Sequence, residues 1–188
     1  NKAYKKFDQM KDSRRVAELL VNKGMIYRKK NDAPGALEIF DRCSDIARVN
    51  GLAPTLNLCF INKAEIFLEK MQLDLAMKYS QKAMELSYLL NDKLSIADIH
   101  KLFGVIASKQ NNFDLAENHL LTSIRLNREL SQELNAAESN YELGLIYKEK
   151  GKKTEAVSNL MCALKYFDKN SAKATVEHIE SQLLELNN

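Results

Sequence analysis

The segment ELGLIYKEKGKKTEAVSNLMCA, residues 142–163, contains three small residues at a fixed spacing. Ala156 follows Gly144 by twelve residues, and Ala163 follows Ala156 by seven. The same spacing recurs every 40 residues toward the N-terminus, which predicts an internal structural repeat. The three columns of small residues are Gly24, Ala64, Gly104 and Gly144, then Ala36, Ala76, Ala116 and Ala156, then Cys43, Ala83, Ser123 and Ala163.

Each repeat is predicted to contain two helices. In the first repeat, helices are expected at about Ser13–Lys30 and Pro34–Asn50, because apolar residues recur there at helical spacing. Proline suits the first turn of the second helix, where no N–H is needed, and Gly51 suits a left-handed helix stop. The turns between the helices are short, which predicts antiparallel neighbours.

The small columns are expected to hold the paired helices together. A glycine or alanine on the first helix, facing an alanine on the second, lets the two backbones approach closely. Larger side chains such as Tyr27, Phe67 and Tyr147 then fill the space around the contact. Because one helix pair cannot bury both of its faces, the pairs are expected to stack in series.

This pattern resembles the tetratricopeptide repeat. The residues that carry the resemblance are Gly144, Tyr147, Ala156, Leu160 and Ala163, and in the first repeat Gly24, Tyr27, Ala36, Phe40 and Cys43. The resemblance implies an all-α fold, a right-handed superhelical solenoid of antiparallel helix pairs. The predicted organisation is a single domain, with the end of a preceding repeat at 1–16, repeats at 17–56, 57–96, 97–136 and 137–176, and a capping helix at 171–188.

The repeats also depart from the common family pattern. Their period of 40 residues exceeds the usual length of about 34, and resembles the long-repeat subclass of cell-polarity adaptors and bacterial peptide-sensing regulators. The second repeat departs at Ala64 and Ser80. The third has Ala107 at an aromatic position and His100 where the family often has tryptophan. Such a resemblance specifies the fold strongly and the function weakly.

The composition narrows the class of protein. The chain has 188 residues, of which 45% are apolar and 28% charged, with a net charge of +3. No apolar run reaches the roughly 18 residues that predict a transmembrane helix, and the first residues are not those of a signal peptide. The near balance of charges favours neither nucleic acid nor a membrane as the partner, and we expect a cytoplasmic protein.

No catalytic or metal-binding constellation is found in the sequence. It has none of the phosphate-binding, dinucleotide-binding, serine-hydrolase or zinc-protease motifs. The three widely spaced cysteines are expected to be reduced and buried, and we expect no catalytic residue, metal or cofactor. A nucleophilic pair of Cys59 with His100 is the one alternative left open. The remaining histidines, His119 and His178, are expected on the surface, and His100 in the core or at its edge.

The first helix of each repeat is expected to line a concave groove, because the resemblance places these helices on the inner face. An apolar strip with polar flanks suits a partner helix or an extended peptide. The alternative for each apolar member is a place in the core between helices. The predicted groove residues are Val21, Asn22, Met25, Arg28, Lys29, Leu58, Ile61, Asn62, Glu65, Leu68, Asp98, Lys101, Val105, Glu138, Tyr141, Leu145 and Lys148.

Asn22 and Asn62 occupy the same place in the first two repeats. In related repeats an asparagine there hydrogen-bonds the backbone of a bound peptide, because an amide both donates and accepts. The third and fourth repeats have Leu102 and Glu142 instead. Of the lysine, asparagine and arginine set with which the family grips chaperone C-termini, this chain has Lys101 alone, so chaperone tails are not expected as ligands.

Basic residues gather where the first helix of each repeat ends. Cations there interact favourably with the helix dipole, which is one interpretation. The other is a basic rim along the groove that attracts acidic peptides. The residues are Arg28, Lys29, Lys30, Lys70, Lys109, Lys148 and Lys150.

The sequence therefore favours a non-enzymatic interaction module that binds a protein or peptide in its groove. The alternative is a regulatory or sensor segment of a larger signalling protein or transcription regulator, in which the groove binds an effector or an internal helix.

Overall fold

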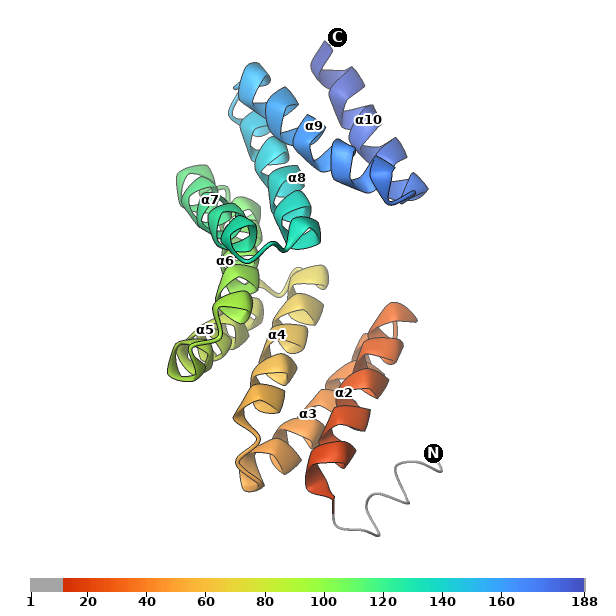
Figure 1. Ribbon diagram of the computed structural model, residues 1–188, viewed down its shortest axis with the longest axis vertical. Helices are drawn as coiled ribbons and strands as arrows, with labels where there is room; N and C mark the ends of the chain where they lie inside the picture. The colour runs from red at the N-terminus through yellow and green to blue at the C-terminus, as the bar shows by residue number, and fades with distance from the viewer. Residues whose placement is uncertain (1–11, 188) are drawn as a thin grey trace. The chain divides into compact units, whose positions relative to one another are not determined.

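A computed structural model describes residues 12–187, and within this range it contains nine α-helices and no strand (Figure 1). The all-α prediction is confirmed. Most of the segment expected to end a preceding repeat, 1–11, lies outside the described residues, and 13–16 belong to the first helix. The helices are α2 Ser13–Lys29, α3 Ala33–Val49, α4 Ala53–Glu69, α5 Leu73–Leu90, α6 Lys93–Lys109, α7 Phe113–Glu129, α8 Glu133–Glu149, α9 Lys153–Lys169 and α10 Lys173–Asn187.

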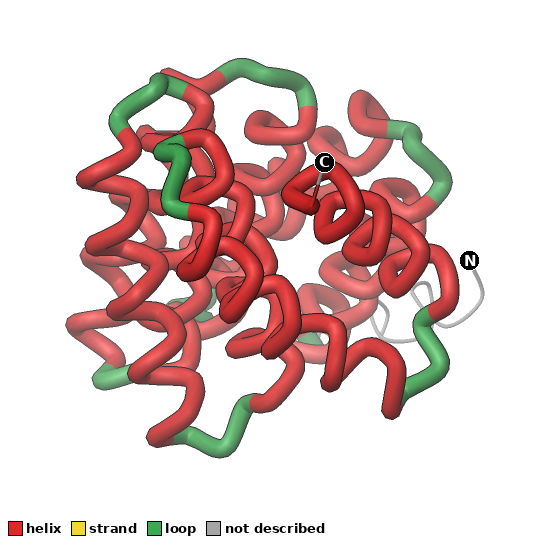
Figure 2. The backbone as a smooth tube through the Cα atoms, turned by 90° about the horizontal axis from the view of Figure 1, so that it is seen from above, coloured by secondary structure: helices red, strands yellow, loops and turns green. Residues whose placement is uncertain are grey.

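Each described helix begins 20 residues after the one before it. Two helices with their turns therefore make up the 40-residue repeat, and the connections are short throughout (Figure 2). We call α2, α4, α6, α8 and α10 the A helices, and α3, α5, α7 and α9 the B helices. This even spacing gives every helix the same length of chain to cross its partner before it turns back.

The same backbone turn ends every helix from α2 to α9. Its central residue has a positive φ, between 52° and 70°. The next residue donates its N–H to the carbonyl five residues back, as from Asp32 to Tyr27 at 3.0 Å, which is a Schellman motif. The left-handed stop predicted at Gly51 is confirmed, and it extends to every turn. The eight central residues are Asn31, Gly51, Met71, Asn91, Asn111, Ser131, Gly151 and Ser171.

The described helices form two compact units, α2–α5 and α6–α10. Within each unit, consecutive helices pack against one another. The A helices also touch directly, α2 with α4 and α6 with α8. The predicted repeat boundaries within the single domain remain predictions.

The helices of a pair meet where a glycine on the A helix faces a large apolar side chain on the B helix. A Cβ atom added to Gly24 would lie 2.6 Å from Cζ of Phe40, and one added to Gly104 would lie 2.6 Å from Cγ of Leu120. The close approach predicted from the small columns is therefore present. The partner is different from the one expected, since Ala116 contributes only its carbonyl oxygen, 3.3 Å from the added atom at Gly104.

The pair α4–α5 makes this contact in another way. Ala64 and Ser80 are both small and both completely buried. Phe67 and Tyr79 stack beside them, with their ring centroids 5.4 Å apart. Where the A helix carries a methyl group, the B helix has given up its large side chain.

The cysteines occupy two kinds of position. Cys43 and Cys59 are completely buried, as predicted, and the Cys43 thiol donates to the carbonyl of Ala17 at 3.3 Å. The prediction was wrong for Cys162, which is exposed. It precedes the buried Ala163 by one residue, and one residue turns the side chain by about 100° around a helix.

Helix α10 packs on α9 in the role predicted for a capping helix. Ile179 is completely buried in a cluster that includes residues of α9. Leu184 stands where the other A helices have a glycine or alanine, and it is 65% exposed. A large residue is tolerated there because no described B helix covers it.

Replacing Gly104 by leucine is expected to lower the free energy of unfolding by roughly 1–3 kcal/mol or more, because the new side chain must displace Leu120. Chemical denaturation of the variant and the wild type measures the difference. Adding Leu120→Ala should recover part of the loss, since it makes room for the new side chain. A wild-type midpoint for Gly104→Leu would contradict this packing.

Replacing Met71 by glycine is expected to raise the free energy of unfolding by about 1 kcal/mol, because Met71 has a φ of 57°, a conformation that costs an L-residue energy. Its side chain is 59% exposed, so little packing is lost. Gly51→Ala is the matched opposite, since an added Cβ would meet nothing within 4 Å and only the backbone would be strained. If thermal unfolding shows no opposite shifts, the turns do not carry this strain.

Candidate functional site

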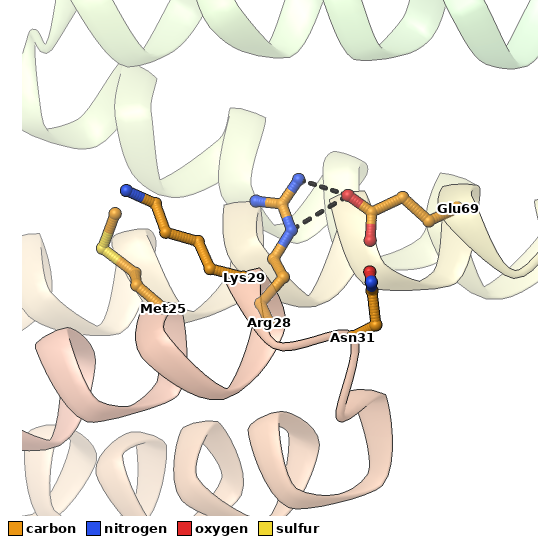
Figure 3. Close-up of a pocket in the computed structure, with 5 residues that line it drawn as sticks. All are labelled: Met25, Arg28, Lys29, Asn31 and Glu69. Carbon is orange, nitrogen blue, oxygen red and sulfur yellow. Dashed lines mark hydrogen bonds and ion pairs between the residues drawn. The ribbon is translucent and has the colours of Figure 1, made fainter.

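In the first unit, an arginine ties the two A helices together. Arg28 on α2 donates from Nε and Nη2 to Oε1 of Glu69 on α4, at 3.0 and 2.6 Å (Figure 3). Its Nη1 bonds Glu65, one turn earlier on α4. A charged, two-pronged contact of this kind fixes orientation as well as distance. The predicted groove residues Arg28 and Glu65 therefore face each other and hold α2 beside α4.

The second unit repeats the contact between its last two A helices. Lys148 on α8 donates to Glu185 on α10, and these residues follow Arg28 and Glu65 by three repeats. Lys148 also donates to Oε1 of Gln182 at 2.7 Å. The tie between successive A helices is thus a recurring feature of the repeat.

Two further polar contacts join α6 to α8. Lys101 on α6 bonds Glu138 on α8. Asn135 Nδ2 donates to Oδ1 of Asp98 at 2.7 Å. The sequence predicted Asp98, Lys101 and Glu138 on one face, and the structure brings them together. Their charges are directed at one another, which leaves the face close to neutral here.

In the first unit, the predicted apolar groove residues divide between core and surface. Met25 and Leu58 are 41% and 46% exposed, whereas Val21 and Ile61 are buried and Leu68 is half-buried. A pocket of about 330 Å³ lies beside Met25, lined also by Arg28, Lys29, Asn31 and Glu69 (Figure 3). Lys29 is exposed at its edge.

The second unit has a corresponding pocket of about 380 Å³. Leu145 and Phe113 give it an apolar part, and both are half-buried. Val105 and Tyr141 are also half-buried, and the Tyr141 ring lies 5.9 Å from that of His178 on α10. The polar lining residues are Ser108, Lys109, Asn111, Glu142, Lys148, Glu149 and Gln182.

The two predicted amides differ in their surroundings. Asn22 is exposed. Asn62 is buried, and its Nδ2 already donates to the carbonyl of Leu58 at 2.8 Å, one turn earlier on the same helix. Asn22 is therefore free to meet a ligand as the sequence predicted, whereas Asn62 must exchange an internal hydrogen bond to do so.

Glu142 takes the same place in α8. It lines the second pocket and is half-buried. Burial raises the pKa of its carboxyl, while Lys109 and Lys101 act in the opposite direction. A carboxyl group with a raised pKa spends more time protonated and, like an amide, can then both donate and accept.

His100 on α6 and His119 on α7 form a half-buried imidazole pair that the sequence did not predict. Their Nδ1 atoms are 3.0 Å apart, and Phe103 lies against His119 with ring centroids 5.3 Å apart. Burial, with the facing His119 and then Arg125, lowers the pKa of His100 to about 4. The surface position expected for His119 was wrong, whereas His178 is exposed as expected.

The repeat register could have revealed this pair. Forty residues earlier, the same two positions hold Phe60 and Tyr79, whose rings lie 6.1 Å apart. Aromatic residues at both positions indicate a contact between the A and B helices. The tie between Arg28 and Glu69 gave no such signal, because each residue is ordinary on a helix surface.

The described part of the chain shows no constellation for catalysis. From 12 to 187, no three His, Cys, Asp or Glu side chains are grouped so that they could hold a metal ion. No helix in that range is long and apolar enough to cross a membrane.

Two regions of the chain, residues 17–50 and 137–174, match the family model of the tetratricopeptide repeat. They contain the segments on which the resemblance was based. Both regions are tetratricopeptide repeats, and the resemblance is confirmed. No curated protein matches the sequence.

Solved structures with similar folds include two bacterial regulators. Aspartyl phosphate phosphatase F from Bacillus subtilis is 17% identical, with a TM-score of 0.82 over 95% of this chain and 47% of that one. A Rap protein complexed with competence and sporulation factor is 19% identical, with a TM-score of 0.75 over 82% of this chain and 43% of that one. The chain thus spans less than half the length of either.

A third similar structure is a putative kinesin light chain from Podospora anserina with nearly identical TPR-like repeats. It is 12% identical, with a TM-score of 0.65, and the match covers 93% of this chain and 95% of that one. At these identities the likeness shows the fold alone, a helical repeat solenoid of the tetratricopeptide type.

Acid is expected to destabilise the protein through the imidazole pair. The unfolded imidazole binds a proton near pH 6.5, and folded His100 only near pH 4, so the unfolded state binds more protons in between. The free energy of unfolding should therefore fall as the pH drops from about 6.5 to about 4, and this loss should level off below.

A variant with His100→Phe and His119→Tyr carries the residues found at the same positions in the preceding helix pair. It removes both titrating groups and keeps an aromatic contact. Melting temperatures between pH 4 and pH 7 should depend less on pH in the variant than in the wild type. Identical pH dependence in both proteins would contradict the assignment to this pair.

Proposed function

We propose that the protein is a non-catalytic interaction module that binds a peptide or a partner helix along the faces of its A helices. The observation that carries the proposal is the polar tie between neighbouring A helices. Arg28 with Glu65 and Lys148 with Glu185 hold these helices side by side at the same register. A rigid strip of parallel helices is a surface on which an elongated ligand can lie across several repeats.

The chemistry of this strip suits a polypeptide. Met25 and Leu58 expose apolar area, and Asn22 supplies an exposed amide close by in the sequence. Pockets of about 330 and 380 Å³ in the two units are large enough for single side chains of a ligand. Apolar contacts give affinity, and the amide satisfies a ligand backbone group without selecting its side chains.

The solved neighbours add support. The Rap protein of similar fold was solved in complex with competence and sporulation factor. Its fold matches most of this chain, and the repeat class itself is known for interaction surfaces that extend over stacked units. A protein or peptide partner is therefore the ligand class we infer, in the cytoplasm and in a signalling role.

The second candidate is a regulatory segment of a longer signalling protein or transcription regulator. The observation that favours it is coverage, since the chain matches only 47% and 43% of the two bacterial regulators. In such a protein the strip would bind an effector or an internal helix. A catalytic or DNA-binding domain in the same gene would support this candidate.

The test begins with affinity capture from cell extract, identification of the partner by mass spectrometry, and measurement of its affinity. Replacing Asn22 and Asn62 together by alanine is expected to weaken binding about tenfold or more, since each unpaired ligand group costs roughly 1–3 kcal/mol. The two losses need not add, because α2 and α4 are in contact.

Leu121→Ala with Met161→Ala is the matched control. Both residues are exposed on B helices, so the variant should bind as the wild type does. If the asparagine variant binds with wild-type affinity and has an unchanged circular dichroism spectrum, the A-helix strip is not the binding surface. If the B-helix variant loses affinity instead, the partner binds on the opposite helices.

Lys29 provides a separate test of the basic rim. It is exposed at the first pocket, so Lys29→Glu should slow association with an acidic partner and reduce its salt dependence. Arg28 is unsuitable for this purpose, because its replacement would also release Glu65 and Glu69 and disturb the packing of α2 on α4.

A further inference from the structure

The second unit contains a cleft that is separate from the predicted groove. Its volume is about 600 Å³, and it lies between the end of α7, the first half of α8 and the second half of α9. None of its lining residues is among the predicted groove residues. Its size falls in the range of sites for small ligands, roughly 300–1,000 Å³.

Three cations line this cleft. Arg128, Lys165 and Lys169 face one carboxylate among the lining residues, that of Glu133, so the lining carries a net charge of +2. Elsewhere in the second unit, Lys101, Lys148 and Lys150 form ion pairs, as listed for this unit. No ion pair to the three cleft cations is found among residues 12–187.

The helix dipole explains part of this arrangement. Arg128 and Lys169 lie in the last turns of α7 and α9, where a cation is favourable. Lys165 lies one turn earlier, where the dipole contributes little. The convergence of the three side chains on one cleft therefore has a further cause.

The N-terminus of α8 opens on the same cleft. Gln132 is its N-cap and lines the cleft, and its side chain makes no capping hydrogen bond. Its amide instead donates to the carbonyl of Leu130 at 3.3 Å. In contrast, Asn112 caps α7 by accepting from the N–H of Leu115 at 3.3 Å. The first backbone N–H groups of α8 are thus donors without a side-chain cap.

A buried amide at the cleft points to a ligand independently of the charges. Asn127 lines the cleft, is 0% exposed, and has no hydrogen-bond partner for its Oδ1. Its Nδ2 donates to Ser123 Oγ at 3.2 Å. Ser139 donates to the carbonyl of Asn135, so Ser123 must donate to Ser139 Oγ, 2.9 Å away. This chain of donors fixes the orientation of the amide and leaves Oδ1 as an acceptor.

The first unit provides an internal comparison. The positions 80 residues earlier lie on α3 and α5, in the same places of the repeat. Arg48 matches Arg128, but Glu85 and Leu89 stand where the cleft has Lys165 and Lys169. The basic lining is therefore a property of the second unit and not of the repeat fold.

We propose that this cleft binds a phosphoryl group on a ligand that also carries an O–H or N–H donor. Lys165, Lys169 and the Arg128 fork neutralise the phosphoryl charge, and the N–H groups at the start of α8 bond its oxygens. The neighbouring donor meets Oδ1 of Asn127. A phosphoryl group fits better than a single carboxylate, because its charge approaches −2 at neutral pH and matches the net charge of the lining.

Cys162 gives a direct readout of occupancy. It lines the cleft and is exposed, whereas Cys43 and Cys59 are completely buried, so a neutral alkylating reagent should modify Cys162 first. The rate of alkylation by iodoacetamide is measured at constant ionic strength with three probes. They are ribose 5-phosphate, a phosphoserine tripeptide and citrate.

Both phosphorylated probes are expected to slow alkylation of Cys162 in a saturable way, and citrate is not. The probe with the lower half-saturation concentration identifies the source, a small phosphorylated molecule or a phosphorylated polypeptide. Equal protection by citrate would overturn the proposal, as would no protection by either phosphorylated probe at millimolar concentrations.

Lys165→Ala with Lys169→Ala should raise the half-saturation concentration about tenfold or more, since two charge-assisted contacts are lost. Both lysines are exposed, and circular dichroism checks that the variant folds. Lys78→Ala with Lys173→Ala, two exposed lysines outside the cleft, has the same net charge and should leave protection unchanged. Equal effects of the two double variants would show general charge attraction and overturn the proposal.

Discussion

The close contact between paired helices is the constraint on which the rest of the structure depends. Gly24 lies under the ring of Phe40, and Gly104 lies under Leu120, at distances that leave no room for a methyl group. Helices this close must cross at one fixed place, so each must have the same length before it turns back. The 20-residue spacing and the recurring left-handed turn follow from this requirement.

The stacking of one pair on the next uses a different kind of interaction. Arg28 with Glu69, and Lys148 with Glu185, link neighbouring A helices through charged side chains at the edge of the packed interior. Such pairs add modestly to stability, but their geometry sets the register of the strip. The strip is consequently well ordered and nearly neutral, whereas the basic residues of the α7–α9 cleft keep their charge for a ligand.

One position in the helix pairs shows how much the repeat can vary. In the first pair it joins two aliphatic residues, in the second two aromatic rings, in the third two imidazoles, and in the fourth it holds two asparagines. The residues are Leu20 and Ile39, Phe60 and Tyr79, His100 and His119, and Asn140 and Asn159. The contact needs matching partners rather than a particular residue, so one pair could acquire a pH-sensitive group without loss of the fold.

The sequence by itself determined the period, the helices, their antiparallel pairing and the burial of the small columns, because these depend on residues a few positions apart. Gly144, Ala156 and Ala163 carry that information locally. Local pattern did not indicate the left-handed conformation of Met71, which is imposed by the turn between two packed helices. Nor did it place Cys162 on the surface or bring His119 to His100.

Only the tertiary structure decided which charges are paired and which converge unpaired. Arg28 meets a carboxylate 41 residues away, and Asn127 lines a cleft with Lys165 from another helix. In the sequence all of these are ordinary polar residues of helix surfaces. Their roles depend on the distance and angle between packed helices, which a helical pattern in the sequence does not contain.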